Sequence, residues 1–139
     1  MNLQYISGFL DADGSITISK SHKNAMFKTI KIDFCNNELN ILENIQTYFK
    51  DKHDIKLFIS KKPSKKLTHS DSYTLSCSSN QKCITICNLL ESIHPKKLHR
   101  INTILKYHNK VTKRNGKYSN KEITRKLAYE RLFFSTNFH

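Results

Sequence analysis

The amino-acid sequence predicts an α+β domain in which a four-stranded antiparallel sheet packs on helices. Two observations support this fold class. Short segments of alternating apolar and polar residues occur in two pairs, and segments with the helical spacing of apolar residues precede and follow each pair. Both pairs can be antiparallel hairpins, so no parallel crossover is required. We therefore predict the order helix, two strands, helix, two strands, followed by additional C-terminal helices.

Residues 2–13 predict a first helix, which Gly14 ends. The segment "SITIS" (15–19) and the segment "FKTIKIDF" (27–34) then alternate strictly. They predict a hairpin with one apolar face and one polar, basic face. The apolar face comprises Ile16, Ile18, Ile30, Ile32 and Phe34.

An amphipathic helix is predicted from "NNELNILENIQTYF" (36–49), with Asn36 or Asn37 as its N-cap. A second pair of strands follows, "DIKLFIS" (54–60) and "SYTLSCS" (72–78). The long basic loop between these strands is too polar to be buried.

Three further helices are predicted at the C-terminal end. Residues 80–93 form the first, with Asn80 as its cap and Pro95 as its end. Residues 96–111 and 121–134 form the other two, separated by a basic, Gly-containing linker. The apolar positions of the last helix include Ile123, Leu127 and Leu132.

Length and charge limit the classes of function. The 139 residues predict a single domain over 1–139 that is long enough to bury a core. The net charge of +13 favours a polyanionic partner, with nucleic acid as the first candidate, over a basic surface kept for solubility. No apolar run approaches membrane-spanning length and the N-terminus does not resemble a signal peptide, so we expect a soluble protein without a membrane partner.

The four cysteines predict reduced core residues, because nothing indicates a secretory context. They are Cys35, Cys77, Cys83 and Cys87. A zinc site formed by Cys83 and Cys87 with His94 and His99 is disfavoured. The stretch between the cysteine pair and the histidine pair is too short, and "QKCITICNLLESI" is typical of an apolar helix.

The outward face of the predicted sheet favours double-stranded DNA as the partner. Its positions are hydrogen-bonding or cationic with few aromatic rings, which suits base edges in a major groove better than stacking on single strands. A solvated sheet face is the alternative. The DNA-binding candidates are Ser15, Thr17, Ser19, Ser21, Thr29, Lys31, Asp33, Ser60, Lys62, Ser72, Thr74 and Ser76.

Small residues line one face of the first helix. Gly8 and Ala12 lie four residues apart, with Ser7 beside them. Such spacing lets two helix backbones approach closely, which favours packing against a second copy of the chain over tight packing within one chain. The dimer-interface candidates are Ser7, Gly8, Asp11 and Ala12.

Two aspartates stand where this helix meets the first strand. Asp13 lies at the helix C-terminus, where the macrodipole makes a carboxylate unfavourable by a few tenths to about 1 kcal/mol. A divalent cation would reverse this, because carboxylate and terminal carbonyl oxygens are both hard ligands. Two such acids near a dimer axis would suit metal-assisted phosphodiester hydrolysis. Asp11 is predicted to cap the local turn or to hold a structural hydrogen bond.

The segment "ISGFLDADG" (6–14) resembles the signature of the LAGLIDADG homing endonucleases and differs from it at four of nine positions. The predicted order of elements is similar to that family over nearly the whole chain. A single copy of the motif implies a homodimer. The resemblance implies intron homing: cleavage of both strands of a long pseudo-palindromic DNA target of about twenty base pairs by metal-dependent hydrolysis, leaving short 3′ overhangs. An RNA-binding intron maturase and a non-catalytic DNA-binding protein of the same fold are the alternatives.

The resemblance also implies roles for individual residues. Asp13 would bind the catalytic Mg²⁺, and the backbone carbonyl of Ala12 would be a second ligand. Mn²⁺ would replace Mg²⁺, whereas Ca²⁺ would bind without supporting cleavage. Lys97, with Lys96 as second choice, would order water around the scissile phosphate. Asn36 stands near a family position that contacts active-site water. The family implies no histidine general base, so the histidines are predicted to be structural or to contact phosphate.

Overall fold

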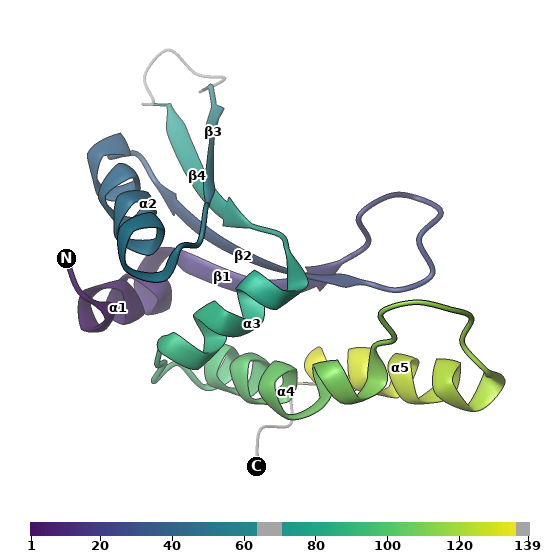
Figure 1. The fold of residues 1–139 in the computed structure, drawn as a ribbon. Helices are drawn as coiled ribbons and strands as arrows, with labels where there is room; N and C mark the ends of the chain where they lie inside the picture. The colour runs from purple at the N-terminus through teal and green to yellow at the C-terminus, as the bar shows by residue number, and fades with distance from the viewer. Residues whose placement is uncertain (64–70, 136–139) are drawn as a thin grey trace.

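The computed structural model describes residues 1–63 and 71–135. Residues 64–70 of the predicted basic loop lie outside this description. Within the described part, four strands form one antiparallel sheet in the order β1-β2-β4-β3, which confirms the predicted α+β class (Figure 1). The elements are α1 (Leu3–Asp13), β1 (Gly14–Ser19), β2 (Thr29–Asn36), α2 (Leu39–His53), β3 (Phe58–Lys62), β4 (Ser72–Cys77), α3 (Asn80–Leu89), α4 (Pro95–Val111) and α5 (Asn120–Phe133).

The helices pack against the apolar face of the sheet. Helices α1, α3 and α4 contact β1 or β2, whereas α2 contacts β2, β3 and β4. Helix α5 packs on α4 and lies farther from the sheet (Figure 1). The predicted inward positions are all buried, and side chains from the helices complete the core. Its central members include Ile6, Leu10, Ile16, Ile30, Ile32, Phe34, Leu42, Ile45, Phe49 and Leu75.

Helix α1 has a defined start and an abrupt end. The Asn2 side-chain oxygen accepts a 2.8 Å hydrogen bond from the Tyr5 N–H, which caps the first turn. At the other end, a Cβ on Gly14 would lie 2.7 Å from Leu10 Cδ1 and 2.9 Å from the Leu10 carbonyl oxygen. Glycine therefore permits β1 to leave the helix directly, which places the end of α1 at the edge of the sheet.

The start of α2 differs from the prediction. Glu38 is the N-cap, and its side chain makes no capping bond, whereas Asn36 is the last residue of β2. The Asn36 side-chain oxygen instead accepts from the Glu38 N–H at 2.8 Å and closes the turn into the helix. The prediction of Asn36 or Asn37 as the cap was therefore wrong.

Strand β3 begins later than predicted. Residues 54–57 connect α2 to β3, and Asp54 adopts a left-handed conformation (φ 52°) that ends α2. Ile55 and Leu57 in this connection are buried. Their alternation, which predicted a strand, thus comes from packing against the core rather than from pairing with a neighbouring strand.

Helix α3 is shorter than predicted. It ends at Leu89, and Pro95 is the first residue of α4 rather than the end of α3. The N–H groups of Glu91 and Ile93 donate to side chains of α1 instead of to the carbonyl oxygens that would continue the helix. Asn80 is not the cap either, because its side-chain oxygen accepts from the Ile30 N–H at 2.9 Å.

Helix α5 buries a different face from the one predicted. Leu127 and Leu132 are 37% and 39% exposed, whereas the buried side chains are Lys126, Tyr129, Glu130 and Phe133. The polar members of this set bind the rest of the chain: Glu130 accepts from the Lys28 N–H at 3.1 Å, and Lys126 donates to Thr112. Tertiary hydrogen bonds thus override the apolar pattern here.

Two further findings concern the general predictions. Cys77, Cys83 and Cys87 are free and buried as predicted, but Cys35 is exposed because it lies on the outward face of β2. In the part of the chain that the structure describes, no helix has both the length and the apolar character needed to cross a membrane.

Candidate functional site

The end of α1 and the end of β2 bring Asp13 and Asn36 together. The Asn36 Nδ2 donates a 3.0 Å hydrogen bond to Asp13 Oδ2, and the Asn36 Oδ1 accepts from the Glu38 N–H. The amide is therefore held at both of its polar atoms. The Asp13 carboxylate is exposed, and within residues 1–63 and 71–135 no second side chain hydrogen-bonds to it. This leaves one of its oxygens available to a ligand.

Lys97 reaches the same end of α1 from the first turn of α4. Its Nζ donates to the carbonyl oxygens of Leu10 and Asp11, each at 2.8 Å. Lys96 is exposed and makes no recorded hydrogen bond to α1 among the described residues. The ammonium group compensates the negative end of the helix dipole, so the unfavourable setting of Asp13 that the sequence indicated is relieved in part by the chain itself.

Asp11 has a structural place. Its carboxylate accepts hydrogen bonds from the Ser92 hydroxyl and, at 2.9 Å, from the Ile93 N–H. Burial opposes ionisation, but the hydrogen bonds from Ser92 and Ile93, together with the charge of Lys97, outweigh it and lower the pKa of Asp11. Asp11 is thus an ionised anchor for the segment between α3 and α4. This is one of the two roles predicted for it.

On the small-residue face of α1, two residues bond within the chain and two are exposed. Ser7 accepts a 2.9 Å hydrogen bond from the Glu91 N–H, so Ser7 and Asp11 bond within the chain. Gly8 and Ala12 are exposed, and a Cβ on Gly8 would meet no atom within 4 Å. A hollow of about 430 Å³ adjoins Gly8, and Ile93 at its edge is 92% exposed. Close packing within one chain therefore does not explain Gly8.

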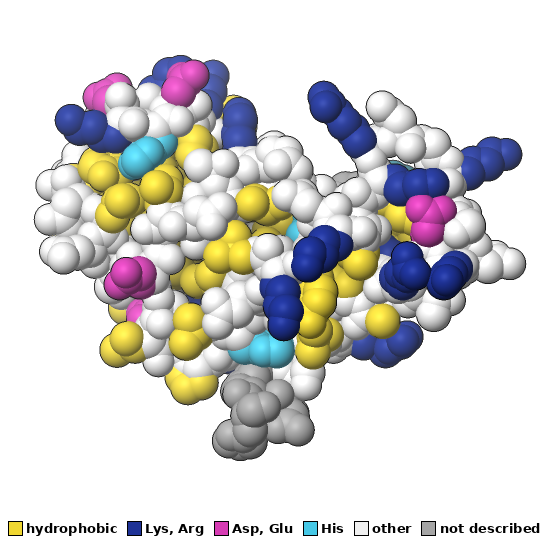
Figure 2. Space-filling view, turned by 60° about the horizontal axis from the view of Figure 1, so that its bottom comes forward, with side chains coloured by type: hydrophobic (Ala, Val, Ile, Leu, Met, Phe, Trp, Pro, Cys, Tyr) yellow, Lys and Arg dark blue, Asp and Glu magenta, His cyan; other side chains and the backbone are white. Residues whose placement is uncertain are grey.

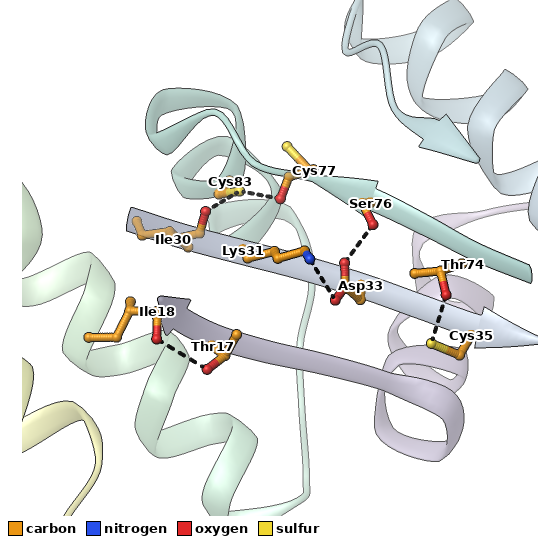
Figure 3. Close-up of polar contacts among 10 residues, drawn as sticks. All are labelled: Thr17, Ile18, Ile30, Lys31, Asp33, Cys35, Thr74, Ser76, Cys77 and Cys83. Carbon is orange, nitrogen blue, oxygen red and sulfur yellow. Dashed lines mark hydrogen bonds and ion pairs between the residues drawn. The ribbon is translucent and has the colours of Figure 1, made fainter. Parts of the chain in front are cut away.

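The outward face of the sheet is lined by polar side chains in cross-strand rows (Figure 3). Ser15, Asp33, Ser76 and Phe58 are successive partners across all four strands. Ser76 donates to Asp33 at 2.7 Å, and Lys31 Nζ lies 3.9 Å from the same carboxylate. A second row pairs Cys35, Thr74 and Ser60, and Lys62 pairs with Ser72.

The register thus places the predicted outward residues of all four strands on one face. Ser19, Ser21, Thr29, Lys31, Ser60 and Ser76 also line a hollow of about 570 Å³ on this face. Two residues of the face were not predicted, Phe58 and Cys35. The signal was present in the sequence, because Phe58 has the same strand parity as Ser60 and Cys35 the same parity as Asp33.

The basic residues concentrate near the C-terminal helices. Residues 95–139 contain 12 Lys and Arg against two Glu. Figure 2 shows Lys and Arg gathered at the end of the molecule where Figure 1 has the β1–β2 loop and the connection between α4 and α5. Phe27 and Tyr118, whose rings lie 4.7 Å apart, join that loop to that connection. This end of the molecule therefore attracts polyanions.

The end of α1 offers few side chains that could bind a metal ion. Across the described residues, no group of three or more His, Cys, Asp or Glu side chains lies close enough together to hold a metal ion. One exposed carboxylate with neighbouring carbonyls fits Mg²⁺ or Ca²⁺, because Mg²⁺ in particular is bound through one or two carboxylates plus water and phosphate oxygens. His99 lies apart from this set and bonds to the Leu132 carbonyl at 2.8 Å, which fits its predicted structural role.

Comparison with solved structures identifies the fold. I-SmaMI bound to its uncleaved DNA target in the presence of calcium ions matches 99% of this chain with a TM-score of 0.64 at 17% identity, and the match covers 45% of that chain. The I-SmaMI LAGLIDADG homing endonuclease bound to cleaved DNA matches 93% of this chain (TM-score 0.63, 15% identity) over 42% of its own. The group I intron-encoded homing endonuclease I-CeuI, complexed with DNA, matches 76% (TM-score 0.54, 19% identity) over 54% of its own.

This chain therefore spans about half or less of the length of these three chains. A search of curated proteins finds no match. The family model described as LAGLIDADG endonuclease matches residues 6–108, which is most of the chain and includes Asp13, Asn36 and Lys97. The fold is the one that these solved endonucleases share, and the family match defines the class as the endonucleases. Within it, the chain belongs to the LAGLIDADG endonuclease family.

Proposed function

We propose that this chain is a site-specific homing endonuclease that acts as a homodimer on double-stranded DNA. One observation carries the proposal: at the end of α1, which leads directly into β1, Asn36 binds the Asp13 carboxylate and Lys97 binds two carbonyl oxygens of the last helical turn. The Asp13 carboxylate is thus next to the sheet whose outward face would contact the DNA bases. A domain over residues 1–139 would contribute one such site, and two copies would contribute one for each DNA strand.

Asp13 and the backbone carbonyl of Ala12 would hold a divalent cation, Mg²⁺ or Mn²⁺, with Ca²⁺ supporting binding without cleavage. The calcium ions present with DNA and I-SmaMI support this choice. When bound, the cation supplies a Lewis acid for phosphodiester hydrolysis. Asn36 holds the Asp13 carboxylate in one orientation, and Lys97, bound to carbonyls of the same helical turn, would supply a positive charge for the scissile phosphate and its water.

The polar face of the sheet would lie in the major groove. Its serines and threonines donate to and accept from base edges, and Lys31 and Lys62 bind bases or phosphates. The longest strand, β2, has eight residues and spans about 26 Å, which is about eight base pairs of one half-site. Two half-sites around a central step predict a pseudo-palindrome of about twenty pairs, cleaved to leave short 3′ overhangs.

The dimer would form through α1. Gly8 and Ala12 are exposed and small, so two α1 helices can approach closely, and Ile93 and Tyr5 beside them would lose their exposure. Ser7 and Asp11 would support this interface indirectly, since they fix the segment that carries Ile93. This arrangement brings the two Asp13 residues near the dimer axis.

The test starts with a randomised duplex library offered to the wild-type protein in Mg²⁺ or Ca²⁺. We expect cleavage of a symmetric target with Mg²⁺ and binding alone with Ca²⁺. Asp13→Asn should bind the selected target in Ca²⁺ but cleave it at least about 100-fold more slowly in Mg²⁺. The matched control is Asp51→Asn, an exposed acid of α2, which should cleave normally. Cleavage by Asp13→Asn at the wild-type rate would show that the metal assignment is wrong.

Two other functions use the same fold. RNA-selective binding without nicking of any duplex would identify an intron maturase. Specific duplex binding that never leads to nicking with Mg²⁺ or Mn²⁺ would identify a non-catalytic DNA-binding protein. The acid–amide pair at the end of α1 favours the nuclease over both, because duplex or RNA binding alone does not require an exposed carboxylate beside the binding face.

A further inference from the structure

We propose that Phe58 recognises the C5-methyl group of thymine in the DNA target, an inference that rests on the proposed function. Phe58 is the first residue of β3 and is 61% exposed. It pairs with Ser76 of β4, whose hydroxyl lies on the outward face and donates to Asp33. The ring therefore stands on the face that we assign to the major groove.

Phe58 is not a displaced core residue. Its neighbour Leu57 is 1% exposed and Ile59 packs against the core, so residues on either side already fill the apolar side of the sheet. Apart from Lys56, no described residue is recorded over the ring of Phe58 from outside, and the side chain stays mostly exposed. Its one described cation contact is Lys56, whose Nζ lies 5.7 Å from the ring centroid. An apolar ring thus remains available on this face.

The surroundings of the ring determine what it can contact. Among the described residues of the outward strand positions, Phe58 is the one aromatic side chain, and the rest are Ser, Thr, Lys, Asp and Cys. Ser60, Ser76, Thr29 and Lys31 line the same hollow as Phe58. These polar side chains can bind the hydrogen-bonding groups of the bases. The apolar ring is suited instead to an apolar group on the DNA.

The major groove offers one apolar group on its base edges, the methyl group of thymine, and phenylalanine is among the residues that contact it. Stacking on an unpaired base is the alternative use of the ring. That alternative requires a base to leave the stack at a cost of a few kcal/mol, and a single ring without aromatic neighbours does not form a stacking platform. The geometry thus points to a methyl contact in an intact duplex.

The experiment uses the duplex target selected with the wild-type protein and replaces each thymine by uracil in turn, which removes the methyl group alone. Affinity is measured in Ca²⁺. Burial of one methyl group predicts about fourfold weaker binding at one position of each half-site, and about 15-fold weaker binding when both are replaced. Phe58→Ala should bind the thymine and uracil duplexes equally, whereas Phe58→Leu should retain part of the preference.

The matched control is Phe134→Ala, which removes an exposed aromatic ring from the helical side of the molecule and should keep the wild-type thymine preference. Wild-type binding that is insensitive to uracil at every position would overturn the inference, and so would a preference that survives in Phe58→Ala. Either result would leave the proposed nuclease intact. Failure to bind or cleave any duplex would instead overturn the proposed function, and this inference with it.

Discussion

The side-chain amide of Asn36, at the end of β2, donates a 3.0 Å hydrogen bond to the carboxylate of Asp13, at the end of α1. The amide oxygen accepts from the Glu38 N–H at 2.8 Å, which fixes which way the amide points. A strand and a turn thereby orient an exposed acid. Under the proposed function, Asn36 would be a positioning residue for Asp13.

Asn36→Ala should lower the apparent affinity of the cleavage reaction for Mg²⁺ by about 10- to 100-fold, because groups that orient a metal ligand have effects of this size. The measurement is the cleavage rate as a function of Mg²⁺ concentration. Higher Mg²⁺ should restore part of the rate, which a structural defect would not allow. Asn37→Ala, at the exposed neighbouring position, is the control. An unchanged Mg²⁺ dependence in Asn36→Ala would contradict the positioning role.

Lys97→Met should have two effects. It removes two charge-assisted hydrogen bonds to the end of α1, which should lower the free energy of unfolding by about 2 kcal/mol. It should also slow cleavage at saturating Mg²⁺, because the charge beside the scissile phosphate is lost. Denaturant unfolding and single-turnover cleavage measure the two effects separately.

The comparison with Lys96→Met decides which lysine acts at the site. Lys96 is exposed in the same helical turn and does not contact α1, so its substitution should leave stability nearly unchanged. We expect it to affect DNA affinity at most, in a salt-dependent way. If Lys96→Met slows cleavage more than Lys97→Met does, the assignment of Lys97 is wrong.

Gly8→Leu should break the dimer without unfolding the chain. A Cβ on Gly8 would meet no atom within 4 Å in the monomer, so the larger side chain has room, but two α1 helices would no longer approach closely. Sedimentation should show a dimer for the wild type and a monomer for Gly8→Leu, with circular dichroism unchanged. Asn40→Leu, at an exposed position of α2, controls for added surface hydrophobicity. A dimeric Gly8→Leu would mean that α1 is not the interface.

The free energy of unfolding should decrease as the pH is lowered, because of His108. Burial, assisted by the nearby charge of Lys126, lowers the pKa of His108 to about 4. The unfolded chain has the ordinary value of about 6.5 and binds the proton first as pH falls. Stability is therefore complete above pH 6.5 and is lost between pH 6.5 and pH 4, by about 3 kcal/mol.

Denaturant unfolding at several pH values between 7 and 4.5 measures this loss. His108→Gln should remove most of the pH dependence in this range, whatever its effect on stability itself. His22→Gln, at an exposed position, should keep it. The same slope in His108→Gln and wild type would locate the titrating group elsewhere.

Local pattern was sufficient for the first hairpin of the sheet and for the motif. Strict alternation around Ile16 and Ile30 predicted β1, β2 and their inward faces, because strand periodicity depends on adjacent residues. The predicted bounds failed where distant groups replaced local bonds. The end of α3 is an example, since side chains of α1 bind the backbone of residues 91–93 and stop the helix early.

The sequence therefore predicted that an acid would stand where a helix meets a strand, and Asp13 does so because Gly14, without a Cβ, permits the change of conformation there. The family resemblance pointed to Lys97 and Asn36, but the residue pattern around Asp13 did not predict the contacts that these two residues make. Lys97 reaches the carbonyl of Asp11 across 86 positions of the chain, and Asn36 reaches Asp13 across 23. Such contacts depend on how the helices pack on the sheet, and neither the spacing nor the periodicity of residues records that packing.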